Sequence, residues 1–247
     1  MIADIKTIIW KEMKEVLIQR GGSRGGFFGI LIILGLMGVI LPLQTGSEWL
    51  RNPFLLLIWS WLPIFLVINI VADAFAGERE RHTLETLLAS RLSDRAIMLG
   101  KISAAVLYAW GMAVSGMLLG AVTVNLANLG SGLQFYSGYA FPAGVVLSLL
   151  ASVLVASLGV MVSLHAPTAR AAYQRLSAIM IVIWLVPTIV LQFLPGELSA
   201  EIFGVLGAVN IGAVLAWGAA VLLVADMILI YIGLARFRRA RLLSHTV

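Results

Sequence analysis

Long runs without a single charged residue constrain this chain more than any other feature of its sequence. Such runs lie between Arg24 and Glu48, between Arg51 and Asp73, and over residues 102–169. A helix needs about 20 mostly apolar residues to cross the hydrocarbon core of a bilayer. Apolar residues make up 61% of the chain and charged residues only 12%, whereas soluble domains average about 45–50% and roughly 25%. We therefore expect an all-α integral membrane protein.

The uncharged runs predict six transmembrane helices. The run 102–169 is too long for one span, and the polar, glycine-bearing segment 125–134 divides it. The six predicted spans are the segments between Arg24 and Glu48 and between Arg51 and Asp73, then residues 102–124, 141–164, 176–194 and 212–235. Residues 1–247 are interpreted as a single transmembrane domain, in which residues 196–211 form a short outer-face or re-entrant element.

The distribution of basic residues predicts the orientation of these spans. All of the 17 lysines and arginines except Arg51 fall on one side of them. Cytoplasmic loops of membrane proteins carry such an excess, so both termini are expected in the cytoplasm. The net charge of +5 is thereby explained by topology, and it does not indicate a nucleic-acid partner.

The first 20 residues predict an amphipathic helix. An apolar stripe recurs at helical spacing and contains Ile2, Ile5, Ile9, Met13 and Val16. Most of the charged residues lie elsewhere around the helix, so this face can rest on membrane lipid at the interface before the first span begins. A merely solvated leading helix is the alternative.

The segment 77–101, between the second and third predicted spans, carries the most distinctive pattern. One helical stripe within it contains Leu84, Leu87, Leu88 and Leu92. A short amphipathic helix of this kind lies on lipid or inserts its leucines into a groove of a soluble partner. Its mixed charges favour the protein partner, because lipid association favours a mainly cationic polar face. After this stripe, Ser93 is expected to cap a new helix, with Asp94 in its first turn.

The same segment resembles the coupling-helix region of permease subunits of the type-2 class of ABC exporters. The resemblance rests on Glu-Arg-Glu-Arg at 78–81, Thr-Leu-Glu at 83–85, Leu-Leu at 87–88, Leu-Ser-Asp at 92–94 and Gly-Lys at 100–101. The layout of a leading amphipathic helix, six spans and a short element before the sixth span is also similar. His82 stands where many relatives have glycine, and Arg91 stands where many have proline.

The resemblance implies a non-catalytic permease subunit that exports its substrate with ATP hydrolysed by separate ATP-binding subunits. Such a permease pairs with a second copy or a homologue in a prokaryotic cell (inner) membrane. ATP and Mg would bind to the partner subunits, and this chain would bind no cofactor. Carried over residue by residue, the surface that docks on the ATP-binding subunit consists of Glu78, Arg79, Glu80, Arg81, Thr83, Leu84, Glu85, Leu87 and Leu88.

The residues themselves give no phosphate-binding loop and no metal site. Such a loop requires Gly-x4-Gly-Lys-Ser/Thr, because backbone amides and the lysine converge on the phosphates. Before Gly-Lys at 100–101, Arg95 occupies the upstream glycine position, and Ile102 occupies the hydroxyl position after it. The chain has no cysteine, and its three histidines do not have the spacing of metal ligands. ATP hydrolysis is therefore expected in another chain.

Asp226 is the main candidate for a residue on a translocation path. It lies ten positions before Arg236, which places it about 15 Å deep in the sixth span. Intramembrane acids usually face a bundle interior or a water-filled cavity and often mark a pathway. A hydrogen bond to a neighbouring helix, made for packing alone, explains the residue equally well. Asn69 is the second candidate for the path, and for this residue the packing role is the commoner one.

Two other classes of function remain open from the residues. A proton- or cation-coupled secondary transporter or channel would use Asp226, but that class predicts internal repeats, and no convincing repeat is found. A membrane-embedded enzyme would need a convergent set of catalytic groups, which the few polar residues of the spans do not supply. The segment 77–101 favours the exporter permease over both. The sequence gives no indication of the substrate.

Overall fold

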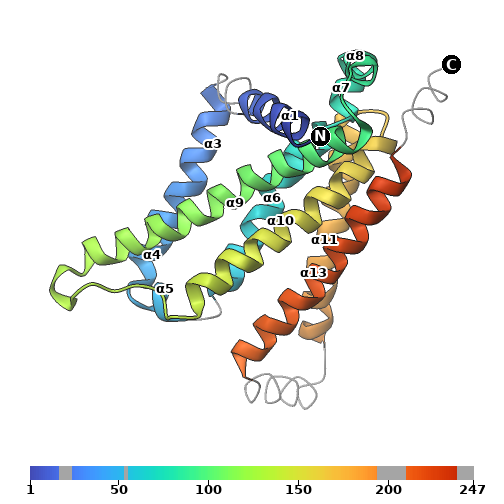
Figure 1. Ribbon diagram of the computed structural model, residues 1–247. Helices are drawn as coiled ribbons and strands as arrows, with labels where there is room; N and C mark the ends of the chain where they lie inside the picture. The colour runs from blue at the N-terminus through green and yellow to red at the C-terminus, as the bar shows by residue number, and fades with distance from the viewer. Residues whose placement is uncertain (17–23, 53–54, 194–209, 238–247) are drawn as a thin grey trace.

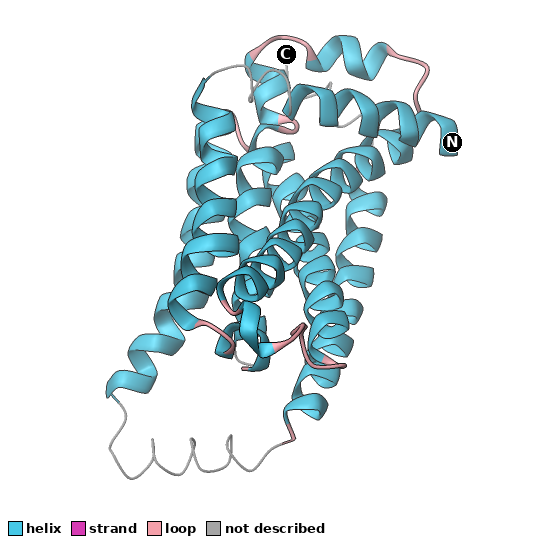
Figure 2. Ribbon diagram, turned by 90° about the vertical axis from the view of Figure 1, so that its left-hand side faces the viewer, coloured by secondary structure: helices cyan, strands magenta, loops and turns pink. Residues whose placement is uncertain are grey.

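The computed structural model describes residues 1–16, 24–52, 55–193 and 210–237, and over these residues the chain is helical without any strand. The long helices run side by side in one bundle (Figures 1 and 2). Three short helices, α1, α7 and α8, gather at one end of the bundle, where the N-terminus and the end of α13 also lie (Figure 1). We call this end the basic end and the other the opposite end.

Long helices occupy the positions of the predicted spans. The order is α1 (Ile2–Lys14), α3 (Arg24–Gly35), η2 (Leu36–Ile40), α4 (Leu41–Thr45), α5 (Glu48–Arg51), α6 (Leu55–Asp73), α7 (Ala76–Glu80), α8 (Leu84–Ala89), α9 (Asp94–Ala127), η3 (Leu129–Ser131), α10 (Ala140–His165), α11 (Ala169–Phe193) and α13 (Ile211–Arg236). Within the described residues, four segments are long and apolar enough to cross a membrane: Phe28–Thr45, Asp94–Ala127, Ala140–His165 and Ile211–Ala235. The chain is thus a multi-pass membrane protein.

The first span is not a regular α-helix throughout. Between α3 and α4 lies the π-helical turn η2, followed closely by Pro42. Proline has no N–H to donate to the carbonyl four residues earlier, which here is that of Gly38. The Thr123 hydroxyl of α9 lies 2.7 Å from this carbonyl and hydrogen-bonds to it, and it also lies 2.9 Å from the Leu119 carbonyl of its own helix. The irregular span is therefore held in register by α9.

The helix start predicted at Ser93 is confirmed. The Ser93 hydroxyl accepts a 3.3 Å hydrogen bond from the backbone N–H of Ala96, and Asp94 stands in the first turn. From there α9 continues for 34 residues, about 51 Å, because no proline interrupts it. This helix therefore begins eight residues before the predicted span, and α11 begins seven residues before its own.

The core lies where α6, α9 and α10 pack together, with α10 also touching α11 and α13. Half of the membrane-spanning window of α10 is buried, but only 6% of that of α13 and 11% of that of Phe28–Thr45. A membrane helix exposes to lipid whatever its neighbours leave uncovered. The first and last spans are therefore the edges of this bundle.

The helix α1 packs on α9 instead of standing apart from the bundle. Its Ile8 is buried, and Ile5 and Val16 pack against the same core, whereas Ile2 and Trp10 are 82% and 74% exposed. One flank of the apolar stripe therefore meets protein. The exposed flank is the part that the predicted membrane interface would cover.

The predicted outer-face element, residues 196–211, falls almost entirely outside the described residues. Its last residues are described, and they start α13. The Asn210 side chain accepts a 2.9 Å hydrogen bond from the backbone N–H of Gly212 and so caps this helix.

Candidate functional site

The helix is interrupted by a turn between α6 and α7, and Ser163 of α10 bonds to both sides of the interruption. The Ser163 hydroxyl donates to the carbonyl of Ala72 at 2.9 Å. It also accepts from the backbone N–H groups of Phe75 and Ala76, at 3.1 and 3.0 Å. Interrupted helices leave such groups without intrahelical partners. One fully buried side chain thus replaces the hydrogen bonds of the missing turn.

A buried cluster of opposite charges joins α1, α7 and the start of α9. The Lys101 ammonium lies 2.8 Å from Glu12 Oε1 and 3.0 Å from Glu78 Oε1. The Lys11 ammonium lies 2.8 Å from the same Glu78 oxygen and 3.3 Å from Glu12 Oε1. The side chains of Lys101 and Glu78 are only 2% and 5% exposed. The ammonium of Lys101 also lies 5.2 Å from the centroid of the Phe75 ring, a cation–π contact.

The cluster stabilises the charged forms of Glu12 and Lys11. Burial tends to raise the pKa of Glu12, but the charges and hydrogen bonds of Lys101 and Lys11 outweigh it and hold this pKa below its usual value. Burial tends to lower the pKa of Lys11, but Glu12, Glu78 and Glu15 raise it above its usual value. The carboxylate of Glu12 and the ammonium of Lys11 are therefore both charged at neutral pH.

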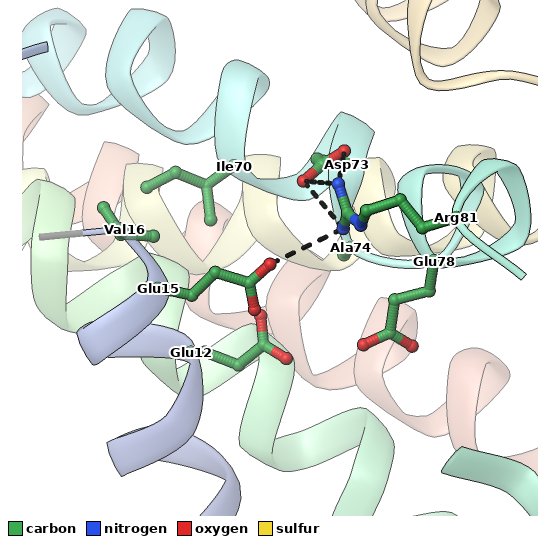
Figure 3. A pocket seen from close by; sticks show the side chains of 8 residues that line it. All are labelled: Glu12, Glu15, Val16, Ile70, Asp73, Ala74, Glu78 and Arg81. Carbon is green, nitrogen blue, oxygen red and sulfur yellow. Dashed lines mark hydrogen bonds and ion pairs between the residues drawn. The ribbon is translucent and has the colours of Figure 1, made fainter. Parts of the chain in front are cut away.

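A second group of ion pairs lies beside this cluster. Arg81 is paired with Asp73 at 3.2 Å and with Glu15 at 3.6 Å, so α6, α7 and α1 meet here too (Figure 3). A Cβ at position 77 would overlap the Asp73 carboxylate and meet the Arg81 guanidinium at 3.2 Å, so a larger residue there would displace this ion pair. Together with Glu12 and Glu78 these residues line a small cleft of about 10 Å³, the least volume that holds a water molecule.

Two further contacts tie this region to α10 and α13. The Arg79 guanidinium donates to the carbonyls of Leu164, at 2.9 Å, and of Ala166, at the end of α10. Carbonyls at a helix end lack intrahelical donors, so Arg79 caps the helix. Phe237, just beyond α13, packs its ring on that of Phe75 with the centroids 5.4 Å apart. The contacts described so far join α7 and the residues before it to α1, α9, α10 and α13. We call this set of contacts the junction.

The predicted docking residues divide into buried and exposed ones. The segment forms two short helices, α7 and α8, joined by a turn in which His82 has a φ of +56°. Leu84 and Leu88 are predicted from the sequence to enter a partner's groove. In the structure they face inward, are 7% and 5% exposed, and belong to the chain's own core. Glu78 and Arg79 are engaged in the junction. Still open to a partner are Glu80, Arg81, Thr83, Glu85 and, in part, Leu87.

Asp226 lies inside the bundle. It is 4% exposed, and neither of its carboxylate oxygens has a hydrogen-bond partner among the described residues. Its helix, α13, packs on α10, whose buried Ser157 hydroxyl is also without a partner in the described part of the chain. Asn69 differs, because it lies on an exposed part of α6. The two residues predicted for a translocation path thus occupy different environments.

Several residues of the junction were not predicted from the sequence, among them Glu12, Lys101, Ser163 and Phe237. Glu12 carried a usable signal, since it lies at helical spacing between the apolar residues Ile8 and Val16. A carboxylate on an apolar stripe needs a buried cation, and Lys101 at the start of a long uncharged run was available. Serine and phenylalanine are too common in membrane helices to have given a signal.

Comparison with known proteins decides the family. A family model described as ABC-2 family transporter protein matches residues 32–204 of the 247. The chain belongs to the ABC-2 transporter family. The matched range includes α6 to α11, and so the α7, α9 and α10 parts of the junction. A search of the curated proteins finds no match to this ABC-2 permease subunit.

Proposed function

We propose that this chain is the permease subunit of an ATP-driven exporter, with six spans, both termini in the cytoplasm and separate ATP-binding subunits docked on α7 and α8. A second copy or a homologue completes the membrane part in a prokaryotic cell membrane, and ATP and Mg bind to the docked subunits. The observation that carries the proposal is the junction. The helix α7, which holds part of the predicted docking surface, is bonded to α1, α9 and α10.

A displacement of α8 would be transmitted to the spans through one short turn and a few direct contacts. Only the turn 81–83 separates α8 from α7. Three side chains on or beside α7 then transmit the movement, Glu78 to Lys101, Arg79 to the end of α10, and Arg81 to Asp73 and Glu15. Because these contacts are buried or multiple, the elements move as a unit, and a docked subunit that closes on ATP pulls on the spans.

The docking surface that remains open is polar. Its exposed residues are Glu80, Arg81, Thr83 and Glu85, with Leu87 half-buried, and a surface of mixed charge selects partners of complementary charge. Leu84 and Leu88 position this surface from below by holding α8 on the chain. Replacing these two leucines with aspartate would place carboxylates in a core and disrupt α8. Substitution of exposed residues is therefore the cleaner test.

The test is co-purification with candidate ATP-binding subunits after co-expression. We expect the wild-type complex to co-purify and to hydrolyse ATP. The variant Glu80→Lys/Glu85→Lys should keep its helix content but lose most of the bound subunit. The matched control Lys6→Glu/Lys14→Glu reverses two exposed charges on α1 and should keep the subunit. A Glu80/Glu85 variant that retains the partner and full ATPase activity would contradict docking on α8.

The carboxylate of Asp226, which has no hydrogen-bond partner in the part of the chain that the structure describes, favours a second candidate, a proton- or cation-coupled secondary transporter or channel. The two functions differ in what the chain does alone. In vesicles without any ATP-binding subunit, a secondary transporter moves protons or cations at a rate that falls in Asp226→Asn. The exporter permease predicts no such flux, and it places Asp226 on a path that opens only in the complex. A pH-sensitive or cation-sensitive dye inside the vesicles separates the two.

A further inference from the structure

The loop between α9 and α10, residues 128–139, exposes large apolar side chains at the opposite end of the bundle. Leu133 is 99% exposed and Leu129 is 82% exposed, and Phe135 and Tyr139 are more than half exposed. Contiguous apolar patches on a protein surface mark an interaction site. Neither the loop nor the rest of residues 102–169 contains Asp, Glu, Lys or Arg, so no charge on this loop requires it to face water.

Hydrogen bonds to the backbone hold the loop in this form. The Asn125 side chain donates to the carbonyl of Gln134 and accepts from its N–H, both at 2.7 Å. The buried Tyr136 hydroxyl donates to the carbonyl of Met117 at 3.1 Å. Gly132, which lies between Asn125 and Gln134, has a φ of +74°, a conformation that glycine adopts without strain. These bonds thus fix the loop along the end of α9 and hold Leu133 in its exposed position.

The exposed residues of the loop continue an apolar stripe of α9. Leu118, Val122 and Leu126 are exposed and lie four residues apart on one face of this helix. In a membrane-spanning helix such a stripe faces lipid. At this end α9 diverges from α13, and the tip of the loop projects to the side of the bundle (Figure 1). The apolar surface therefore passes from helix to loop with no charged boundary.

We propose that the loop 128–139 inserts its apolar side chains into the lipid leaflet at the opposite end of the bundle and anchors the end of α9 there. The occupant is lipid because the surface is uncharged, points sideways and continues the stripe of a membrane-spanning helix. Tyrosine is also a residue that prefers the interface between lipid and water, and Tyr139 is exposed beside the leucines. The inference holds for either orientation of the chain and does not depend on its partners.

The test uses nitroxide labels, and the absence of native cysteine makes single-site labelling direct. Leu133→Cys is labelled in the full chain and reconstituted in vesicles of phosphatidylethanolamine and phosphatidylglycerol. Collisions with oxygen, which concentrates in lipid, are compared with collisions with a water-soluble nickel chelate. Glu48→Cys is the matched control, because Glu48 is exposed and charged at the same end. Both substitutions replace exposed side chains, so neither should disturb folding.

The expected result is an oxygen-to-nickel collision ratio severalfold higher at position 133 than at position 48. Equal ratios would place the loop in water and overturn the proposal. Shielding of position 133 from both reagents would overturn it as well. Broadening between the labels of two chains would then assign the loop to an interface between copies. In the background of Asn125→Ala, the label at 133 should become more mobile and its ratio should fall, and an unchanged spectrum would contradict the anchoring role of Asn125.

Discussion

The two ends of the bundle are held together by different kinds of interaction. At the basic end, ion pairs and side-chain bonds to backbone join elements that lie far apart in the chain, such as Glu12 with Lys101 and Ser163 with Phe75. At the opposite end, the described contacts are mainly apolar packing, with hydrogen bonds between uncharged groups, local at Asn125 and long-range at Thr123. Polar contacts fix distances and directions, whereas apolar packing tolerates sliding. The difference indicates a more rigid basic end and a softer opposite end.

The largest effect is expected for Lys101→Met. This change leaves Glu12 and Glu78 buried with only the half-exposed Lys11 as a counter-charge. Breaking a buried ion pair costs about 3–5 kcal/mol of the free energy of unfolding. Denaturant unfolding in detergent micelles, followed by circular dichroism, measures it. Lys14→Met, at an exposed lysine of α1, is the control and should change stability by about 0.5 kcal/mol or less. If Lys101→Met lowers the free energy of unfolding no more than Lys14→Met does, the basic end is not the more rigid of the two.

The next effect compares single hydrogen-bonding side chains at the two ends. Ser163→Ala leaves three buried backbone groups without their partner, a loss of about 1–3 kcal/mol. Ser152→Ala is a control on the same helix, since this buried hydroxyl bonds only a carbonyl of its own helix. Asn125→Ala at the opposite end should cost about 1 kcal/mol, because the two hydrogen bonds that it removes join uncharged groups. If Asn125→Ala proves the costlier change, the opposite end is the more rigid one.

The acid sensitivity of the basic end follows from Glu12. Its pKa is lower in the folded chain than its ordinary value of 4.5, so the unfolded chain binds the proton more tightly. The stability contributed by this group is present above pH 4.5 and is lost as the pH falls through the lowered folded-state pKa. The free energy of unfolding should decrease as the pH is lowered from 6 to 3, roughly the range over which carboxylic acids titrate. Glu12→Gln should make this decrease smaller, and Glu48→Gln, at an exposed residue of the opposite end, should not.

The smallest effect is expected in the turn between α7 and α8. His82 has a φ of +56°, a region that costs most residues about 1–2 kcal/mol but glycine little. His82→Gly should therefore raise the free energy of unfolding by about 1 kcal/mol or less, since glycine also loses more chain entropy. His82→Val should lower it. A destabilising His82→Gly would mean that the histidine side chain contributes more than the backbone strain costs.

Much of the helical layout could be predicted from the uncharged runs, because hydrocarbon demands long apolar helices. The predicted span 141–164 differs from α10 by one residue at each end. The agreement is poorer where a helix continues beyond the apolar region. For α9, hydropathy predicted a span from residue 102, whereas the capping pattern at Ser93 identified the true helix start. Hydropathy marks the part of a helix suited to lipid, and capping residues mark the helix itself.

The candidate site could be predicted only in outline. Residue types identified the segment 77–101, but an amphipathic stripe cannot tell the chain's own core from a partner's groove, and Leu84 and Leu88 face the core. The partners of the charged residues were not predictable by spacing either, because Lys101 pairs with a glutamate 89 positions away. Spacing rules describe neighbours on one helix, and the junction is made of neighbours from different helices.

The hydrogen bond from Thr123 to Gly38 has a consequence for biogenesis. The first span leaves the ribosome well before α9, and until α9 enters the bilayer this span lacks the Thr123 hydroxyl, while Pro42 already leaves its helix one N–H donor short. An unpaired carbonyl in hydrocarbon is costly. We therefore expect the newborn first span to stay at a polar or protein-lined site until α9 packs beside it.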